Sequence, residues 1–326
     1  MTEENRNNPI LYLVVPCYNE EEIIRDSAKA FKEKMTALSS EGVISDRSRV
    51  MFVNDGSRDN TLSILTEIVR EDELFSLVSL AGNCGHQNAI FAGMMTAKAA
   101  DIVVTIDADL QQDINALDDF IACYKKGAEV VYGVRNDRSS DGGFKKFTAL
   151  LYYKLMNMMG SRVIKNHADY RLVSRKVLDA LAQYSESNLF LRGLIPTMGF
   201  ASDTVFFDVK ERTAGSSKYT LSKMFKLATD GITSFTVRPL HMISGLGIIV
   251  VVLSVILSIV SLIEWAQGKN VPGYTTLLLV VLALSGVILL SLGVIGEYLG
   301  KVYMETKNRP RYIIDCVIHK DGEDED

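Results

Sequence analysis

Two long runs without charged residues lie near the end of the chain. No Asp, Glu, Lys or Arg occurs from Pro239 to Ile263, and the same holds from Asn270 to Gly296. A helix needs about 20 apolar residues to cross a bilayer core of about 30 Å, and both runs reach that length. Trp265, in the short connection between them, suits interfacial depth. We therefore predict a hairpin of two transmembrane helices, at about 240–263 and 274–297, in a multi-pass membrane protein.

The basic residues around these spans predict their orientation. Both flanks carry several Lys and Arg residues, whereas the connection between the spans holds only Lys269. The positive-inside rule therefore places both termini and the soluble part in the cytoplasm, at the inner (cytoplasmic) membrane. Met1 to Asn8 is polar, so we expect no signal peptide. Residues 219–238 mix apolar and basic side chains, which favours an amphipathic helix at the interface, with packing against the soluble domain as the alternative.

The front of the chain alternates predicted strands and helices. Short apolar runs predict strands at 10–15, 49–53, 76–80, 101–106 and 129–134. Between them, Asn19 is expected to cap a first helix, and further helices are expected at about 60–72 and 87–100. Repeated βα units predict an α/β fold, Rossmann-like, with a mostly parallel sheet. We expect a soluble domain at 1–218, a juxtamembrane helix at 219–238, the two spans within 239–299 and a cytoplasmic tail at 300–326.

Polar residues gather where these strands end, and ligands of parallel sheets bind beyond that edge. The strongest signal is Asp107-x-Asp109, directly after an apolar strand. Two carboxylates at this spacing suit Mg²⁺ or Mn²⁺, and Gln111 could add an amide oxygen. A helix-capping role for one aspartate is the competing interpretation. The net charge of −5, without a basic block, argues against a nucleic-acid partner.

Four segments carry a family resemblance. VVPCYNEEE, VNDGSRDNT, NCGHQNAIFAGM and DADLQQD occur in this order, and they resemble family-2 glycosyltransferases of the GT-A fold. With the paired spans, residues 9 to about 312 resemble the polyprenyl-phosphate glycosyltransferases, which include the bactoprenol glucosyltransferase group and dolichyl-phosphate mannose synthase. Many relatives carry a proline after the glutamines, where this chain has Asp113-Ile114; that difference alters a turn and no ligand.

The resemblance implies an activity and a set of partners. The activity is inverting, metal-dependent transfer of a sugar from a nucleotide sugar, UDP-glucose or UDP-N-acetylglucosamine being examples, to undecaprenyl or another polyprenyl phosphate. The product would be a lipid-linked sugar for glycosylation of the cell envelope. The resemblance also implies a homo-oligomer, tetramers being known among relatives. UDP is preferred to GDP because the resemblance is to bacterial proteins, while glucose, N-acetylglucosamine, galactose and mannose stay open.

The resemblance also implies roles for individual residues. Asp107, Ala108 and Asp109 would serve the donor, with Asp107, Asp109 and Gln111 around the metal ion. Gly85 would allow close backbone approach. The nucleotide base and ribose would be lined by Pro16, Tyr18, Glu20 and Asp55.

The acceptor side follows from its chemistry. A hydroxyl acceptor needs a general base, whereas a lipid phosphate is already anionic and needs cations around it. Arg135, Arg212 and Lys218 are the predicted acceptor-phosphate ligands, the latter two matching an arginine and a lysine of the family. Asp169 is predicted to face the sugar or the acceptor, and it joins Asp107 and Asp109 as a candidate catalytic residue.

Two other functions stay open. A processive synthase acting on a hydroxyl acceptor usually carries Gln-x-x-Arg-Trp, but the single tryptophan here lies between the spans. A non-catalytic membrane partner, for example of a lipid-sugar flippase, would not need the aspartates and cations. Binding of a donor nucleotide would distinguish that partner from an enzyme.

Overall fold

The computed structural model describes residues 6–97, 99–136, 167–186, 190–208, 273–320 and 322–324, together with single residues and short runs between 240 and 267. The chain divides into two compact units. The first comprises Met1–Lys154, Arg162–Lys218 and Pro310–Asp326, and the second comprises Leu155–Ser161 and Tyr219–Arg309.

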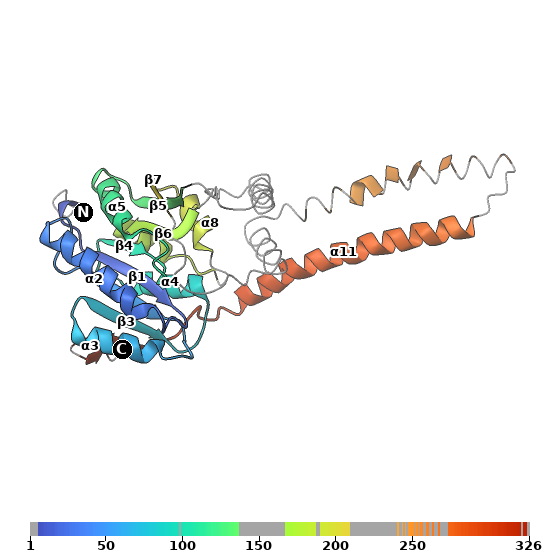
Figure 1. The fold of residues 1–326 in the computed structure, drawn as a ribbon. Helices are drawn as coiled ribbons and strands as arrows, with labels where there is room; N and C mark the ends of the chain where they lie inside the picture. Colours follow the sequence, from blue (N-terminus) through green and yellow to red (C-terminus); the bar gives the residue numbers. More distant parts are fainter. Residues whose placement is uncertain are drawn as a thin grey trace. The chain divides into compact units, whose positions relative to one another are not determined.

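The first unit is an α/β domain (Figure 1). Its strands are β1 (Leu11–Cys17), β2 (Arg49–Asn54), β3 (Phe75–Leu80), β4 (Ile102–Thr105), β5 (Val130–Arg135), β6 (His167–Ser174), β7 (Ser202–Phe207), β8 (Ile314–His319) and β9 (Gly322–Asp324). Its helices are α2 (Ile24–Ser40), α3 (Thr61–Glu71), α4 (His86–Thr96), the short η1 (Ile114–Ala116), α5 (Leu117–Lys125), α7 (Arg175–Leu181) and α8 (Leu191–Thr197).

These strands form one sheet in the order β7-β5-β6-β4-β1-β2-β3-β8-β9. The strands β4, β1, β2 and β3 run parallel to one another, as does β5 to β7. In contrast, β6 is antiparallel to both β4 and β5. The predicted α/β class with a mostly parallel sheet is confirmed, and the five predicted strands correspond to β1–β5.

Helices cover both faces of the sheet, as right-handed βα connections require. One core contains Phe31 of α2, Leu65 of α3 and Phe120 of α5. The opposite core contains Ile90 of α4 with residues of α7 and α8. Successive residues of β1 enter opposite cores, because side chains alternate along a strand. The strand ends that carry polar residues therefore rest on a sheet that is buried on both faces.

The predicted cap at Asn19 is wrong. Helix α2 begins at Ile24, after Ile23 as its capping residue. Asn19 instead has a left-handed backbone, with φ of 56°, and its Oδ1 accepts a hydrogen bond of 2.9 Å from the backbone N–H of Arg58. This bond joins the loop after β1 to the loop after β2, so Asn19 shapes the sheet edge.

The strands β8 and β9 were not predicted from the sequence. β8 pairs antiparallel with β3, and β9 with β8. Just before β8, the guanidinium group of Arg311 lies 4.6 Å from the centre of the Phe91 ring, and Tyr312 packs edge-on against the same ring. Residues that follow the apolar region thus complete the sheet of the first unit.

The second unit contains α11 (Tyr274–Thr306), which begins at the predicted span and continues beyond it. Within the described part of the chain, one helical stretch, Leu284–Thr306, is long and apolar enough to cross a membrane, by length and composition. The predicted span 240–263 is described only in part; its described residues are helical, and most of their side chains are exposed. The predicted helix at 219–238 lies outside the described residues, so the hairpin and the juxtamembrane helix stay predictions.

Candidate functional site

The candidate site lies at the edge of the sheet where β4 ends, and the direction of β6 brings Asp169 to the same edge. The carboxyl ends of β4 and β5 reach this edge. Strand β6 is antiparallel to both and begins at this edge, so Asp169, near its start, lies beside the end of β4. There the Thr105 hydroxyl donates a 2.5 Å hydrogen bond to the Asp169 carbonyl oxygen. Asp107 and Asp109 follow β4 directly. Residues separated by some 60 positions in the chain are therefore neighbours at this edge.

Gln112 holds the first aspartate of the DxD motif. Its Nε2 donates to Asp107 Oδ2 at 2.6 Å, and its Oε1 accepts from the Asp107 backbone N–H at 3.1 Å. Gln112 is buried, whereas Asp107 is partly exposed. The contact therefore fixes one carboxylate oxygen from inside the protein.

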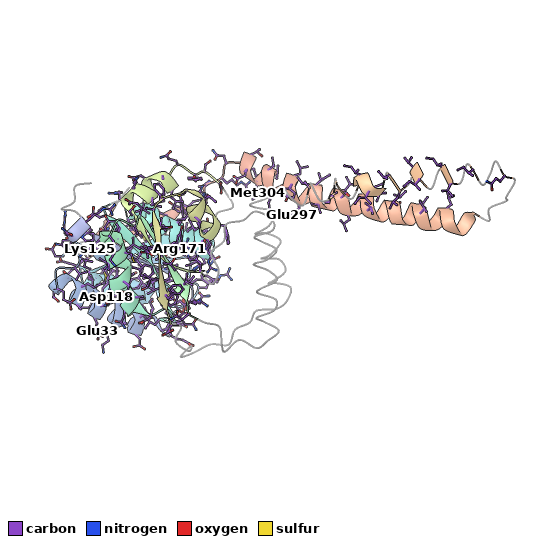
Figure 2. The ribbon with its side chains drawn as sticks, turned by 90° about the horizontal axis from the view of Figure 1, so that it is seen from above. Glu33, Asp118, Lys125, Arg171, Glu297 and Met304 are labelled. Carbon is purple, nitrogen blue, oxygen red and sulfur yellow. The ribbon has the colours of Figure 1, made fainter. Side chains whose placement is uncertain are left out.

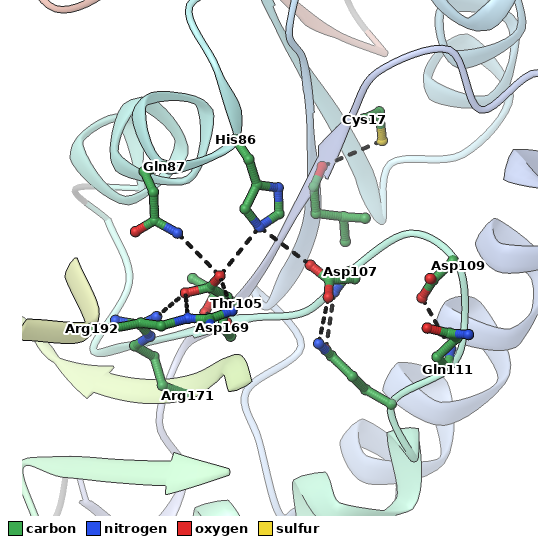
Figure 3. Close-up of polar contacts among 12 residues, drawn as sticks. Cys17, His86, Gln87, Thr105, Asp107, Asp109, Gln111, Asp169, Arg171 and Arg192 are labelled. Atoms are coloured by element: carbon green, nitrogen blue, oxygen red, sulfur yellow. Dashed lines mark hydrogen bonds and ion pairs between the residues drawn. The ribbon is translucent and has the colours of Figure 1, made fainter. Parts of the chain in front are cut away.

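His86 joins the two carboxylates. It is the first residue of α4, and its Nε2 lies 3.5 Å from Asp107 Oδ1 and 3.5 Å from Asp169 Oδ2. Figure 3 shows the imidazole between the two aspartates. Asp107 and Asp169 therefore belong to one site, although they come from different strands.

Asp169 is paired with two arginines. It accepts hydrogen bonds from the fully buried Arg171 and from Arg192 of α8, whose Nε and Nη2 lie 3.0 and 2.6 Å from its two oxygens. Gln87 Nε2 donates to it at 3.0 Å. Arg171 lies inside the sheet domain (Figure 2).

The charges at this edge shift several pKa values. Burial raises the pKa of the Asp107 carboxyl, and the charge of His86 offsets part of that rise. Burial also opposes ionisation of Asp169, but His86 and the two arginines prevail and hold its pKa well below the ordinary value. Burial acts to lower the pKa of His86, but its hydrogen bond to Asp169 and the charge of Asp107 outweigh burial and raise that pKa.

Asp55 organises the loop before α4. Its carboxylate accepts from the backbone N–H groups of Cys84 and Gly85 at 2.7 and 3.0 Å, and from Asn83 Nδ2 at 3.1 Å. Gly85 has φ of 92°, which favours glycine, and nothing lies within 4 Å of the place a Cβ would occupy. Asp55 therefore holds the backbone before His86, and among the described residues no other atom lies close to the side of Gly85 where a side chain would be.

The turn after β4 offers oxygen ligands of the kind that Mg²⁺ and Mn²⁺ prefer. Leu110 has a left-handed φ of 53°, and Asp109 Oδ1 accepts from the Gln111 backbone N–H at 3.1 Å. Asp107, Asp109 and Gln111 all come from this turn and are partly exposed. Among the described residues, no group of three or more His, Cys, Asp or Glu is arranged to hold a metal ion. Mg²⁺ usually keeps waters and substrate phosphates as further ligands, so this donor set fits it.

The other predicted site residues that the structure describes lie at or near the ends of β1, β4 and β5. Pro16, at the end of β1, and Ala108 are buried, Tyr18 is 41% exposed, and the Glu20 backbone N–H donates to Thr61 Oγ1 at 2.8 Å. Arg135 is the last residue of β5. Arg212 and Lys218 lie outside the described residues. The roles predicted for all of these residues stay predictions.

Four residues at the site were not identified as site residues from the sequence: His86, Gln87, Gln112 and Arg192. His86 and Gln87 stand within NCGHQNAIFAGM, and Gln112 within DADLQQD, so the motifs contained the signal without the contacts. Arg192 lies in NLFLRGL, whose pattern points only to a helix with one cation. The packing of α8 places Arg192 beside Asp169.

Comparison with known proteins gives a consistent result. Residues 12–182 match the family model described as Glycosyl transferase family 2. The chain is 42% identical over 318 residues to the uncharacterized glycosyltransferase YkoT of Bacillus subtilis (strain 168), covering 97% of this chain and 94% of that protein. It is 38% identical over 304 residues to the SfII prophage-derived bactoprenol glucosyl transferase of Shigella flexneri, covering 93% and 96% respectively.

Among solved structures, glucosyl-3-phosphoglycerate synthase of Mycobacterium tuberculosis aligns with a TM-score of 0.46 at 17% identity, covering 72% of this chain and 82% of that chain. That similarity is too low to support an inference about this chain. The family match and the two relatives show that the chain belongs to glycosyltransferase family 2. The predicted family and the GT-A class of α/β fold are confirmed, and the protein is a glycosyltransferase.

Proposed function

We propose that this protein transfers a sugar, with inversion, from a nucleotide sugar to a polyprenyl phosphate such as undecaprenyl phosphate. The observation that carries the proposal is the extent of the match to the bactoprenol glucosyl transferase. The alignment covers 304 of the 326 residues and leaves about 22 unaligned, which is fewer than the 33 residues of α11, so it must include part of that helix. The relative named for a lipid acceptor therefore matches part of the apolar helix as well as the sheet domain.

In this proposal the edge of the sheet holds the donor. Tyr18, Glu20 and Asp55 line the nucleotide, with Pro16 and Gly85 contributing through their backbone. Asp107, Asp109 and Gln111 hold Mg²⁺ or Mn²⁺, which when bound stabilises the negative charge of the departing diphosphate. Gln112 and His86 keep Asp107 oriented. The donor is a UDP-hexose, for example UDP-glucose or UDP-N-acetylglucosamine.

The acceptor phosphate needs no base. Its oxygen is already anionic and attacks the anomeric carbon directly, while the bond to the diphosphate breaks. Arg135, Arg212 and Lys218 hold that phosphate through charge-assisted hydrogen bonds. The domain 1–218 lies in the cytoplasm, and the spans near 240–263 and 274–297 anchor it at the inner membrane, where the lipid head group reaches the site. Packing between spans of neighbouring copies would give the homo-oligomer.

The test is a panel of labelled sugar nucleotides against two kinds of acceptor. Purified full-length protein with Mg²⁺ or Mn²⁺ receives UDP-glucose, UDP-N-acetylglucosamine, UDP-galactose or GDP-mannose, and either undecaprenyl phosphate or a polyprenyl alcohol. Transfer to the phosphate alone supports the proposal. Transfer only to the alcohol, or donor binding without transfer to either, overturns it. The outcome also identifies the sugar.

A further inference from the structure

The Asp169 carboxylate has no capacity left for a further ligand. A carboxylate offers about four lone-pair positions. Arg171 Nη2 and Arg192 Nε donate to Oδ1, while Arg192 Nη2 and Gln87 Nε2 donate to Oδ2. His86 Nε2 lies 3.5 Å from Oδ2 as well. These contacts leave no position for a metal ion, and a base so fully paired is a poor proton acceptor.

Charged groups of both signs surround Asp169. Two guanidinium groups, those of Arg171 and Arg192, face its carboxylate, and the Asp107 carboxylate lies on the other side of His86. Arg171 is fully buried, but the Arg192 side chain is 38% exposed. Of these two guanidinium groups, the one that a substrate can reach therefore belongs to Arg192. Figure 3 shows Arg192 beside Asp169, which His86 connects to Asp107.

We propose that Asp169 is a positioning residue that holds the Arg192 guanidinium at the site, where Arg192 binds a phosphate oxygen of a substrate. This inference rests on the proposed function, because both the donor and the acceptor then carry phosphate groups. A bidentate contact fixes the plane of the guanidinium group, and an oriented guanidinium loses less entropy when it binds a phosphate. Asp169 thereby acts through Arg192.

The experiment compares variants of the full-length membrane protein in steady-state assays. Arg192→Gln removes the charge and Arg192→Lys retains it without the planar geometry. Asp169→Asn removes the positioning charge, and the double variant tests whether both act together. Arg25→Gln is the matched control, because the exposed ion pair of Arg25 and Glu67 at 2.5 Å is built from residues that line no part of the site. Thermal unfolding is recorded for each variant.

We expect Arg192→Gln to raise the KM of one phosphate-bearing substrate about ten- to hundredfold, as loss of a charge-assisted hydrogen bond would. Arg192→Lys should restore part of that loss. A rise in the KM of the lipid phosphate assigns the contact to the acceptor, and a rise in the KM of the nucleotide sugar assigns it to the donor. Asp169→Asn should raise the same KM, and the double variant should be no worse than the worse single variant.

Two results would overturn the inference. One is Arg192→Gln with the wild-type KM for both substrates. The other is Asp169→Asn that folds, loses kcat far beyond Arg192→Gln and loses one limb of the pH–rate profile, as a proton acceptor would. If wild type uses a different acceptor, the proposed function fails, whereas the comparison between variants on that acceptor still decides the role of Arg192.

Discussion

Gln112 holds Asp107 through two atoms at once, with its Nε2 on the carboxylate and its Oε1 on the backbone N–H of the same residue. The side chain that makes both contacts is 2% exposed. The first aspartate of the DxD motif is therefore oriented from the interior, and it cannot rotate without breaking a hydrogen bond to a buried side chain.

Replacing Gln112 with Leu should impair catalysis more than folding. The variant keeps a buried side chain of similar size but removes both hydrogen bonds, one of them to a charged group and worth about 1.5–3 kcal/mol. We expect kcat/KM to fall at least about tenfold, with a higher metal concentration needed for half-maximal rate. Gln183→Leu, at an exposed position, is the control. A normal rate in the Gln112 variant would show that Asp107 needs no such support.

Gly56 should not tolerate alanine. Its φ is +62°, and an added Cβ would lie 2.5 Å from the Asn83 backbone nitrogen. Gly42 has a similar φ of +68° but nothing within 4 Å of an added Cβ. The difference between Gly56→Ala and Gly42→Ala therefore isolates the steric contact, and we expect about 1–3 kcal/mol greater loss of unfolding free energy at Gly56. Equal losses, measured by denaturant unfolding, would mean that the two loops separate easily.

His167 should destabilise the folded protein in mild acid. Its ring is buried beside Tyr132, and burial, followed by the charges of Arg171 and Arg192, lowers its pKa to about 2. The folded pKa lies below the unfolded value of about 6.5, so the unfolded chain binds a proton first as the pH falls. The unfolding free energy should then decrease by about 1.4 kcal/mol per pH unit below pH 6.5.

The measurement for His167 is the unfolding free energy between about pH 5 and 6.5, in wild type and His167→Phe. Asp169, whose folded pKa is lowered, loses its contribution only at more acidic pH, and His86, whose folded pKa is raised, loses its contribution only above this window. The variant should have the flatter pH dependence. Identical slopes would mean that His167 is protonated in the folded state.

Removal of divalent cations should stop sugar transfer reversibly. Asp107, Asp109 and Gln111 are oxygen donors on one turn, so a chelator should abolish turnover and added Mg²⁺ or Mn²⁺ should restore it. Thermal unfolding without nucleotide should change little, because hydrogen bonds within the protein, from Gln112 to Asp107 and from the Gln111 backbone N–H to Asp109, already hold this turn. Full activity in the presence of the chelator would mean that sugar transfer needs no divalent cation.

The sequence predicted the strands that are apolar on both faces better than the other strands of the sheet. The runs that became β1–β5 are apolar on both faces, so pattern alone identified them. Strand β6 was missed as a strand because HADYRLVS contains Asp169 and Arg171, and a fully buried arginine has no signature in a single sequence. β8 was missed because it follows a long apolar helix and pairs with a distant β3.

The site was predictable as a set of motifs and not as a set of contacts. Asp107 and Asp109 could be read from their position after a strand. The bridge through His86 depends on β6 being antiparallel, which places Asp169 at the same edge. Arg192 depends on the packing of α8, which the local pattern does not specify.

The most direct test of the account is one extraction. Full-length protein is incubated with a labelled UDP-sugar, Mn²⁺ and undecaprenyl phosphate, and the lipid is then extracted into organic solvent. The account predicts label in the extract for wild type, and almost none for Asp109→Ala that unfolds at the wild-type temperature. Label that stays in water with wild type across all the sugar nucleotides of the panel, or equal lipid labelling by Asp109→Ala, would contradict it.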